Sequence, residues 1–343
     1  MSEQIQLLIK SGTVCNLACV YCGDEVSGPI NRMQLSTLIE LAGQLASLSK
    51  SSIVVAWHGG EPLTAGQSFF IRATEILQSH LKPNQKVLTC VHTNGLLLNE
   101  SWMALFESIQ AAVSISLDGP GEFNDRYRRS KDGNGSFKKT MAALHIAAES
   151  DIGVSVSATV HDDSWRIASD LLDICRSQKV NQLHFEPRLH RGSLRMVRSV
   201  SVEAFYQFVR ALDVTRSGVK NNTDIELPTL GDWSSPGEGQ PASCMFCREL
   251  CFSNLAIDWL GDVYPCDLFH GNASMCIGNI HTKSLSKILT GDMYRLYKLS
   301  ASVIPSICRS CPWAEICCGG CPYHRYMAFG TFERPSLYCS RAL

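Results

Sequence analysis

The sequence places three cysteines close together near its amino terminus. Cys15, Cys19 and Cys22 are spaced C-x3-C-x2-C. A structural zinc site takes four nitrogen or sulfur ligands, and this run supplies only three unless a distant His or Cys joins them. A 4Fe–4S cube has four irons that each need an outer ligand, so three thiolates from one loop leave one iron open to a small chelating molecule. The spacing therefore favours an iron–sulfur cluster over a zinc site or idle thiols.

Cysteine is abundant in the chain, with 16 residues, and eleven of these lie from Cys244 onward. The amino terminus lacks the basic region and cleavage site of a signal peptide, and no apolar run reaches the ~18 residues that span a bilayer. We therefore expect a cytoplasmic protein with no membrane contact. Disulfides are rare in that reducing compartment, where clustered thiols are typical of metal sites. The net charge of -1 provides no broad positive field, so nucleic acid is not an expected partner.

Short apolar runs alternate with amphipathic segments over residues 5 to about 217. The expected strands are 5–9, 52–57, 86–92, 111–117, 153–160 and 182–187. The expected helices are 36–47, 68–80, 99–108, 136–150, 164–178 and 202–214, with Ser36 and Asn99 as N-caps. Six β-then-α repeats imply parallel strands with right-handed crossovers and helices outside. Because a closed TIM barrel needs eight repeats, we expect an α/β fold with an open, partial (β/α)6 barrel.

Chemistry in parallel α/β structures lies at the carboxyl ends of the strands. Five of the expected strands lead into unusual segments, which therefore meet at one face: the Cys15 loop, HGGEP at 58–62, HTNG at 92–95, SLDG at 116–119 and Glu186-Pro187. We expect the barrel over residues 1–217, a polar connector rich in Gly, Pro and Ser over 218–243, and a cysteine-rich domain over 244–343. A small domain with few long apolar stripes needs metal centres to hold its shape.

With Tyr21 as the aromatic residue, C-x3-C-x-aromatic-C resembles the signature of radical S-adenosylmethionine (SAM) enzymes. The resemblance implies that SAM chelates the open iron and yields a 5′-deoxyadenosyl radical, which abstracts hydrogen from carbon inside a shielded barrel lumen. It also implies that glycine lets the GGEP backbone approach the SAM amino group. The residues it assigns to SAM binding are Tyr21, Gly59, Gly60, Glu61, Pro62, Thr93, Asn94, Ser116, Asp118 and Arg128.

Arg128 is assigned as a bidentate partner of the SAM carboxylate. It belongs to the run DRYRR (125–129), so Arg126 and Arg129 are alternatives for that role. An arginine run by itself is more often a solvated face, and two glycines with a proline are more often a simple turn. The order of these motifs on successive strands favours the SAM site.

The carboxyl-terminal cysteines resemble the SPASM extension of radical SAM enzymes. The pattern is Cys251-x9-Gly261-x4-Cys266, then Cys308-x2-Cys311-x5-Cys317-x3-Cys321, and then Cys339. The resemblance implies two auxiliary 4Fe–4S clusters, and so three clusters in all. The first would be held by Cys251, Cys266, Cys321 and either Cys244 or Cys247, and the second by Cys308, Cys311, Cys317 and Cys339. The interleaved ligands would lock one fold. Two structural zinc sites are the alternative, because C-x2-C serves both chemistries.

Asp267 directly follows Cys266. The resemblance implies that its carboxylate points into the substrate chamber and takes the proton released when a substrate radical is oxidised. The alternative is a surface carboxylate or one that supports a ligand. We interpret Cys90 and Cys175 as buried apolar residues, and leave Cys276 and Cys318 unassigned. His58, His92 and His184 are interpreted as packing or hydrogen-bonding residues.

Auxiliary clusters can accept the electron of a substrate radical, which favours two-electron oxidation. Residues 318–339 resemble the end of cross-link-forming peptide maturases, so we expect oxidative carbon–carbon or carbon–heteroatom bond formation in a ribosomally made precursor peptide. GDVYPCDLF (261–269) is shared with anaerobic sulfatase-maturing enzymes, and the alternative is oxidation of Cys or Ser to formylglycine. Expected partners are the precursor peptide and an electron donor such as flavodoxin or ferredoxin. Only fourteen residues precede Cys15, so leader recognition would use a separate protein, the barrel–tail cleft or no leader.

The protein could also belong to another functional class, as a non-catalytic electron carrier or a zinc-binding interaction module. Either function would need cysteines but not the SAM-facing motifs.

Overall fold

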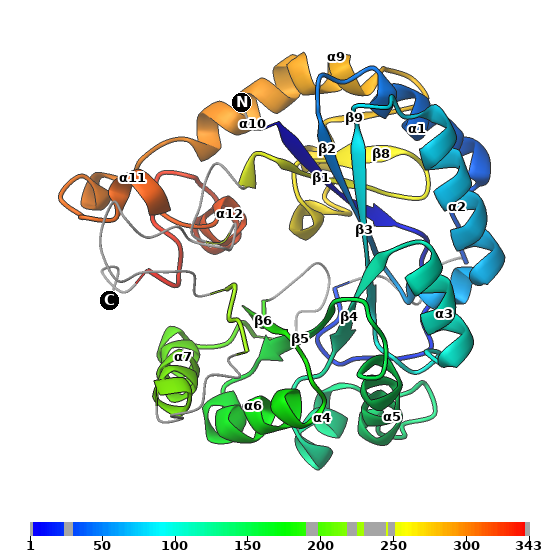
Figure 1. Cartoon of the computed structure of the whole chain (residues 1–343). Helices are drawn as coiled ribbons and strands as arrows, with labels where there is room; N and C mark the ends of the chain where they lie inside the picture. The colour runs from blue at the N-terminus through cyan, green and yellow to red at the C-terminus, as the bar shows by residue number, and fades with distance from the viewer. Residues whose placement is uncertain are drawn as a thin grey trace.

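The structure is a computed structural model that describes residues 3–23, 30–189, 198–217, 225–229, 245 and 251–339. Figure 1 shows a curved sheet whose outer side is covered by helices. No helix in these ranges is both long and apolar enough to cross a membrane.

Six parallel strands form the barrel part of the sheet, in the order β6-β5-β4-β3-β2-β1. Their bounds are β1 (Gln4–Lys10), β2 (Ser52–His58), β3 (Lys86–Thr93), β4 (Ala111–Ser116), β5 (Val154–Val160) and β6 (Gln182–Pro187). All six expected strands are confirmed. Each is rich in β-branched or other apolar side chains that suit a pleated, half-buried surface.

The barrel helices are α1 (Leu35–Ala46), α2 (Gln67–His80), α3 (Glu100–Ser108), α4 (Gly121–Tyr127), α5 (Phe137–Ala147), α6 (Ala168–Ser177) and α7 (Val202–Ser217), with short 3-10 turns η1 (Pro62–Ala65) and η2 (Ser164–Ile167). Asn99 is the N-cap of α3, as expected, and its side chain accepts a hydrogen bond from the Trp102 amide. The expected cap at Ser36 is wrong, because α1 begins one residue earlier, after Gln34. The sequence analysis missed α4, whose seven residues are too short for a periodic signal.

The carboxyl-terminal region extends the barrel sheet. Strand β7 (Asn254–Ile257) pairs in parallel with β1, and β8 (Asp262–Tyr264) and β9 (Gly278–Asn279) follow in antiparallel order. The nine-stranded sheet ends at β6 and β9, so it is open and the expected partial barrel is confirmed. The proposed domain limits at 217 and 243 stay predictions, since most of the connector lies outside the described residues.

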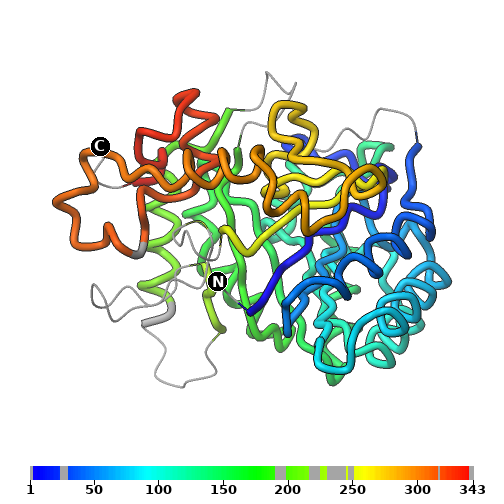
Figure 2. Tube along the Cα trace, turned by 90° about the horizontal axis from the view of Figure 1, so that it is seen from above, coloured from blue at the N-terminus to red at the C-terminus, as the bar shows by residue number. Residues whose placement is uncertain are grey.

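The rest of the chain consists of short helices that run from the β9 side of the sheet towards β6 (Figures 1 and 2). They are η4 (Asp267–Phe269), η5 (Ala273–Met275), α9 (Leu285–Thr290), α10 (Asp292–Ala301), η6 (Ser306–Cys308), α11 (Ala314–Cys317) and α12 (Pro322–Phe329). Near the end of the chain, the Tyr338 hydroxyl donates to the Val200 carbonyl at 3.1 Å, and the Tyr206 hydroxyl of α7 donates to the Tyr338 carbonyl at 2.6 Å. The carboxyl-terminal region therefore spans the open side of the barrel.

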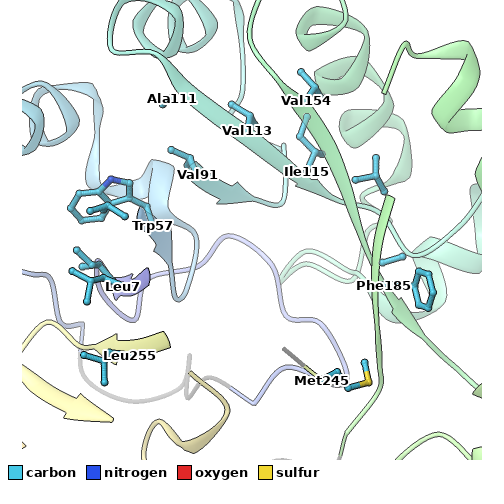
Figure 3. Close-up of a cluster of buried hydrophobic side chains, with 14 of the residues drawn as sticks. Leu7, Trp57, Val91, Ala111, Val113, Ile115, Val154, Phe185, Met245 and Leu255 are labelled. Carbon is cyan, nitrogen blue, oxygen red and sulfur yellow. The ribbon is translucent and has the colours of Figure 1, made fainter. Parts of the chain in front are cut away.

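The main core lies between the sheet and its helices. Figure 3 shows side chains such as Trp57, Val91, Val113 and Phe185 from successive strands in this layer. Because side chains alternate between the two faces of a strand, the residues beside them point to the inner face of the curved sheet. Polar residues at the carboxyl ends of β1 to β6 therefore share that inner face.

Candidate functional site

The three-cysteine loop follows β1 and is held between two other segments. The Glu61 amide donates to the Val14 carbonyl at 2.8 Å, and the Ala18 amide donates to the Arg129 carbonyl at 2.7 Å. Burial raises the pKa of the Cys15 thiol to about 12 and also raises the pKa of Cys19. These thiols are therefore neutral by themselves, and a metal centre must displace their protons on binding.

The glycines of the GGEP turn allow two close approaches within the protein. A Cβ on Gly60, whose φ is +55°, would lie 2.4 Å from the Val14 carbonyl oxygen in the cysteine loop. A Cβ on Gly59 would lie 2.8 Å from Cγ of Lys10. The sequence analysis expected close approach to SAM, and the structure shows close approach to the cysteine loop and to β1. A contact of Gly59, Gly60 or Pro62 with SAM stays a prediction.

Glu61 is a buried acceptor that joins the ends of β2 and β3. Its carboxylate accepts hydrogen bonds from the Leu63 amide at 3.0 Å, the Thr93 hydroxyl at 2.8 Å and the Asn94 amide at 2.7 Å. Burial raises the pKa of Glu61, and these three donors oppose that rise. The described contacts of Glu61 are thus internal, and its expected contact with the SAM amino group stays a prediction.

Asn94 connects the TNG turn to the cysteine loop. Its side-chain amide donates to the Asn16 side-chain oxygen at 2.7 Å and lies 3.9 Å from the Cys15 sulfur. Thr93 holds the same turn, because its hydroxyl accepts from the Gly95 amide at 3.1 Å. The turn after β3 therefore supports the position of Cys15.

Asp118, after β4, is the centre of a buried polar network. It accepts hydrogen bonds from the Tyr21 hydroxyl at 2.7 Å and the Thr159 amide at 3.0 Å, and its Oδ2 lies 3.3 Å from Nε2 of His161. Burial alone would raise the pKa of Asp118, but Arg128 and His161 outweigh it and hold that pKa below its usual value. Tyr21 and Asp118 thus lie together, while no side-chain hydrogen bond within the described residues assigns a role to Ser116 at the end of β4.

The structure separates Arg128 from its two neighbours. Arg128 is 8% exposed, lies 3.8 Å from Asp118 and donates to the Tyr21 hydroxyl. By contrast, Arg126 is exposed and pairs with Asp163 at 2.7 Å, and Arg129 is exposed. Nε of Arg128 is buried and lacks a hydrogen-bond partner in the described part of the chain. A free guanidinium donor beside the cysteine loop fits the carboxylate of SAM.

A second cluster of polar side chains lines the inner face at the ends of β1, β2 and β3. Lys10 Nζ lies 2.9 Å from Oδ1 of Asp267, and both side chains are buried. The rings of His58 and His92 are 5.5 Å apart. Burial is the main cause that lowers the pKa of His92 to about 3. His58 and His184 add to this fall, and Asp267 acts in the opposite direction. His92 is therefore a neutral imidazole.

The inner face also offers unused polar atoms. Nδ1 of His58 and Oγ of Ser114 are buried and have no hydrogen-bond partner within the described ranges. Cys90 is half-buried with its sulfur 3.9 Å from Nε2 of His92, so its interpretation as a buried apolar residue is wrong. Because side chains alternate between the two faces of β3, Cys90 lies on the polar inner face. Cys175, in contrast, is fully buried in α6, as expected.

The carboxyl-terminal thiols form two groups that agree with the expected ligand sets. Cys251, Cys266 and Cys321 lie near Tyr297, because burial and then these three thiols raise its pKa. The Cys251 sulfur lies 3.9 Å from the Tyr297 hydroxyl. Burial raises the pKa of Cys321 to about 12, and Cys266 adds to that rise. The two candidates for the fourth ligand, Cys244 and Cys247, lie outside the described residues.

The second group contains Cys308, Cys317 and Cys339. Burial raises the pKa of Cys317 to about 11, with further contributions from Cys339, Cys308 and Cys318. Cys311 joins them through a turn, because its amide donates to the Cys308 carbonyl at 2.9 Å. The interleaving of Cys317 and Cys321 between the two groups is therefore present in the fold. The ligand assignments themselves stay predictions.

Across the described ranges, no three His, Cys, Asp or Glu side chains have the geometry to hold one metal ion. A 4Fe–4S cube does not need that geometry, because each thiolate binds a different iron atom.

The sequence analysis missed Lys10, His161 and Tyr297. Lys10 and His161 lie at the ends of β1 and β5, so the rule that selected the other strand ends also covers them. Tyr297 had no comparable signal, because its helix brings it to the thiols only in the folded chain.

We predict that Glu61→Gln lowers the free energy of unfolding by roughly 3 kcal/mol. The Glu61 carboxylate accepts hydrogen bonds from three buried donors, and in the variant the side-chain NH2 group, itself a donor, must face one of them. Urea unfolding followed by tryptophan fluorescence under anoxia measures this. Glu40→Gln, at an exposed position on α1, is the matched control and should change stability by less than about 0.5 kcal/mol. Equal stability of the Glu61 variant and the native chain would contradict the role given to this carboxylate.

Two family models match the chain. Residues 9–166 match the radical SAM superfamily, and residues 247–312 match SPASM, an iron–sulfur cluster-binding domain. These ranges contain the cysteine loop with its strand-end motifs, and part of the carboxyl-terminal cysteine pattern.

Curated relatives match almost the full length of the chain. A serine-type anaerobic sulfatase-maturating enzyme from Bacteroides thetaiotaomicron is 27% identical over 95% of this chain and 84% of its own. A cysteine-type anaerobic sulfatase-maturating enzyme from Clostridium novyi is 24% identical over 98% of this chain and 93% of its own.

Solved structures show the same fold. A structure of anSMEcpe with bound AdoMet has a TM-score of 0.85, with 22% identity, 99% coverage of this chain and 94% of its own. Streptococcus suis SuiB bound to its precursor peptide SuiA has a TM-score of 0.74, with 18% identity, 99% coverage of this chain and 76% of its own. With both domains matched in sequence and the fold matched throughout, the chain is a radical SAM enzyme that carries a carboxyl-terminal SPASM domain with iron–sulfur clusters.

Proposed function

We propose that this enzyme oxidises a cysteine or serine side chain of a peptide or protein to formylglycine. The named relatives that match nearly its whole length are serine-type and cysteine-type anaerobic sulfatase-maturating enzymes. The expected cross-linking of a precursor peptide is not confirmed over this alternative, because the likeness to SuiB concerns the fold alone. Peptide oxidation is common to both interpretations.

The residues present fit the cofactors that this function needs. Cys15, Cys19 and Cys22 would hold one cluster, and Arg128 offers its buried free donor to SAM. The two carboxyl-terminal thiol groups would hold the auxiliary clusters. When bound, these groups supply hydrogen-atom abstraction from carbon and acceptance of one electron.

The ion pair between Lys10 and Asp267 is the observation that carries the proposal. Oxidation of a serine side chain to the aldehyde removes one hydrogen atom from Cβ, one proton from the hydroxyl and one further electron. With cysteine the same three losses give a thioaldehyde, which water hydrolyses to the aldehyde with release of hydrogen sulfide. Asp267 lies beside a predicted cluster ligand, Cys266, and its carboxylate reaches the inner face of the barrel at Lys10. An opposite charge this close favours the ionised form of a carboxylate, and an ionised Asp267 could take the hydroxyl or thiol proton.

The inner face also suits a small polar side chain. The unused His58 Nδ1 and Ser114 Oγ can bind a substrate hydroxyl or backbone group. Neutral His92 adds no charge that would compete with Lys10 for Asp267. This part of the inner face therefore combines the Lys10–Asp267 ion pair with polar groups that could bind a substrate.

Product analysis tests the function. The anaerobically reconstituted enzyme is incubated with SAM, a reductant and a peptide that spans the maturation site of a bacterial sulfatase, in cysteine and serine versions. We expect 5′-deoxyadenosine and a peptide that reacts with a hydrazide, as an aldehyde does. A cross-link would instead give a product that has lost two hydrogens, does not react with a hydrazide and resists fragmentation between two residues. That result would overturn the proposal.

We predict that Asp267→Asn lowers aldehyde formation about 10²- to 10⁴-fold, because it removes the proton acceptor. Formation of 5′-deoxyadenosine should fall much less, since SAM cleavage does not use this carboxylate. Asp262→Asn on the neighbouring strand β8 is the control and should keep both activities. If Asp267→Asn retains aldehyde formation within about threefold of the native rate, a carboxylate acting as general base is excluded.

We predict that Arg128→Lys raises the dissociation constant of SAM at least about tenfold, which corresponds to ~1.4 kcal/mol. Lysine keeps the charge but loses the free Nε donor and the planar fork. Anaerobic isothermal titration calorimetry measures the change. Arg126→Lys, two residues away on the surface, should bind SAM normally, and equal weakening in both variants would contradict a specific role for Arg128.

A further inference from the structure

Arg325 is fully buried in the carboxyl-terminal region, with 0% exposure. It lies on α12, which begins directly after Cys321, and its backbone amide donates to the Cys321 carbonyl at 3.2 Å. Figures 1 and 2 show α12 and α11 in the same part of the molecule, where the end of α10 leads into them.

Every described acceptor of the Arg325 guanidinium is a backbone carbonyl. Nε donates to Arg334 at 2.8 Å, Nη2 to Val303 at 2.6 Å, and Nη1 to Ala301 at 3.1 Å and Cys318 at 3.5 Å. Throughout the part of the chain that the structure describes, no carboxylate forms an ion pair with Arg325. Its hydrogen bonds are therefore largely satisfied while its charge is not neutralised.

A buried charge without a counter-charge is costly. Removing an ion from water costs several kcal/mol even after relaxation, and carbonyl dipoles recover only part of that energy. The other buried Lys and Arg side chains of the described residues have such partners: Lys10 pairs with Asp267, and Arg128 lies near Asp118. Arg325 differs from them, and the difference points to an anionic group that it faces when the protein is complete.

The surroundings of Arg325 contain ligands of both predicted auxiliary clusters. Its carbonyl partner Cys318 lies between Cys317 of the second group and Cys321 of the first. A Cβ on Gly319, in the same loop, would lie 3.6 Å from the guanidinium carbon. Cys308, Cys317 and Cys321 are all close enough to influence the charge of Arg325. The guanidinium thus lies near thiols that are assigned to both groups.

We propose that Arg325 is the shared counter-charge of the two auxiliary clusters and holds their reduction potentials at more positive values. This inference rests on the proposed function, in which both thiol groups bind 4Fe–4S clusters. A 4Fe–4S core of charge 2+ bound by four thiolates carries a net charge of 2−, and net charge is a main determinant of cluster potential. A nearby fixed cation favours the reduced cluster, which has one more negative charge.

This placement would serve a two-electron oxidation. The electron that leaves the substrate must find an acceptor of sufficiently high potential, and a permanently charged guanidinium raises the potential without titrating at physiological pH. Its carbonyl partners on three segments (301–303, 318 and 334) would keep the charge fixed when the clusters change oxidation state.

The test compares Arg325→Gln, Arg325→Lys and Arg334→Gln with the native full-length enzyme, each reconstituted anaerobically. Arg334 is exposed in the same region, so its replacement removes one screened charge and serves as the matched control. Iron and sulfide content and redox titrations followed by electron paramagnetic resonance are the readouts. We expect midpoint potentials of the auxiliary clusters to shift to more negative values in Arg325→Gln, and to stay near native values in Arg325→Lys and Arg334→Gln.

An unchanged potential in Arg325→Gln would overturn the inference. If this variant does not hold its clusters, Arg325→Lys decides, because it keeps the charge but loses most of the hydrogen bonds to the carbonyls. A counter-charge role predicts that Arg325→Lys still loads both auxiliary clusters with near-native potentials. A lysine variant that also fails to hold them shows a purely structural role and overturns the inference. Native protein that loads only one cluster would instead refute the proposed function.

Discussion

The ion pair between Lys10 and Asp267 is the contact on which the arrangement of this protein depends. It lies at the carboxyl end of β1, which pairs with β2 of the barrel on one side and with β7 of the carboxyl-terminal region on the other. The residue after β1 begins the segment that carries the first cysteine loop, and Asp267 follows a cysteine of the second region. One strand therefore brings the two cysteine-rich segments to the same inner face, and its terminal lysine joins them by charge.

Buried charge is otherwise distributed according to a simple rule, in which each ion has either an opposite charge or several donors. Asp118 has Arg128 and His161, and Glu61 has three hydrogen-bond donors. These groups join the ends of neighbouring strands, so the polar interactions that shape the site also hold the barrel mouth together. A substitution in the site therefore affects stability as well as chemistry, which is why each activity measurement needs a stability control.

Hydrophobic periodicity predicted the strands and the partial barrel, because these depend on local sequence. The composition of the two thiol groups was implied by the resemblance to SPASM domains, and the ligand sets stay predictions. Three features could not be predicted in that way. The pairing of β7 with β1 requires knowledge of which sheet edge is free. The choice of Arg128 over Arg126 depends on how the chain turns where α4 ends, since Arg126 lies on the helix and Arg128 directly after it. Arg325 is defined by carbonyls from three separate segments. The close approach of Gly59 and Gly60 to β1 and to the cysteine loop could not be predicted for the same reason, since it depends on which segments the fold brings together.

The loop between Cys317 and Cys321 shows how the two carboxyl-terminal groups depend on each other. Cys318, Gly319 and Gly320 all have positive φ, which turns the chain so that cysteines four residues apart point to different groups. A Cβ on Gly320 would lie 2.7 Å from Cβ of Ser336, and the Ser336 amide donates to the Gly319 carbonyl at 2.7 Å, three residues before Cys339. Ligands of both groups are thus fixed by one turn packed against the end of the chain. The two thiol groups therefore share one structural element, the turn from Cys317 to Cys321, and Arg325 contacts that turn at the Cys318 carbonyl.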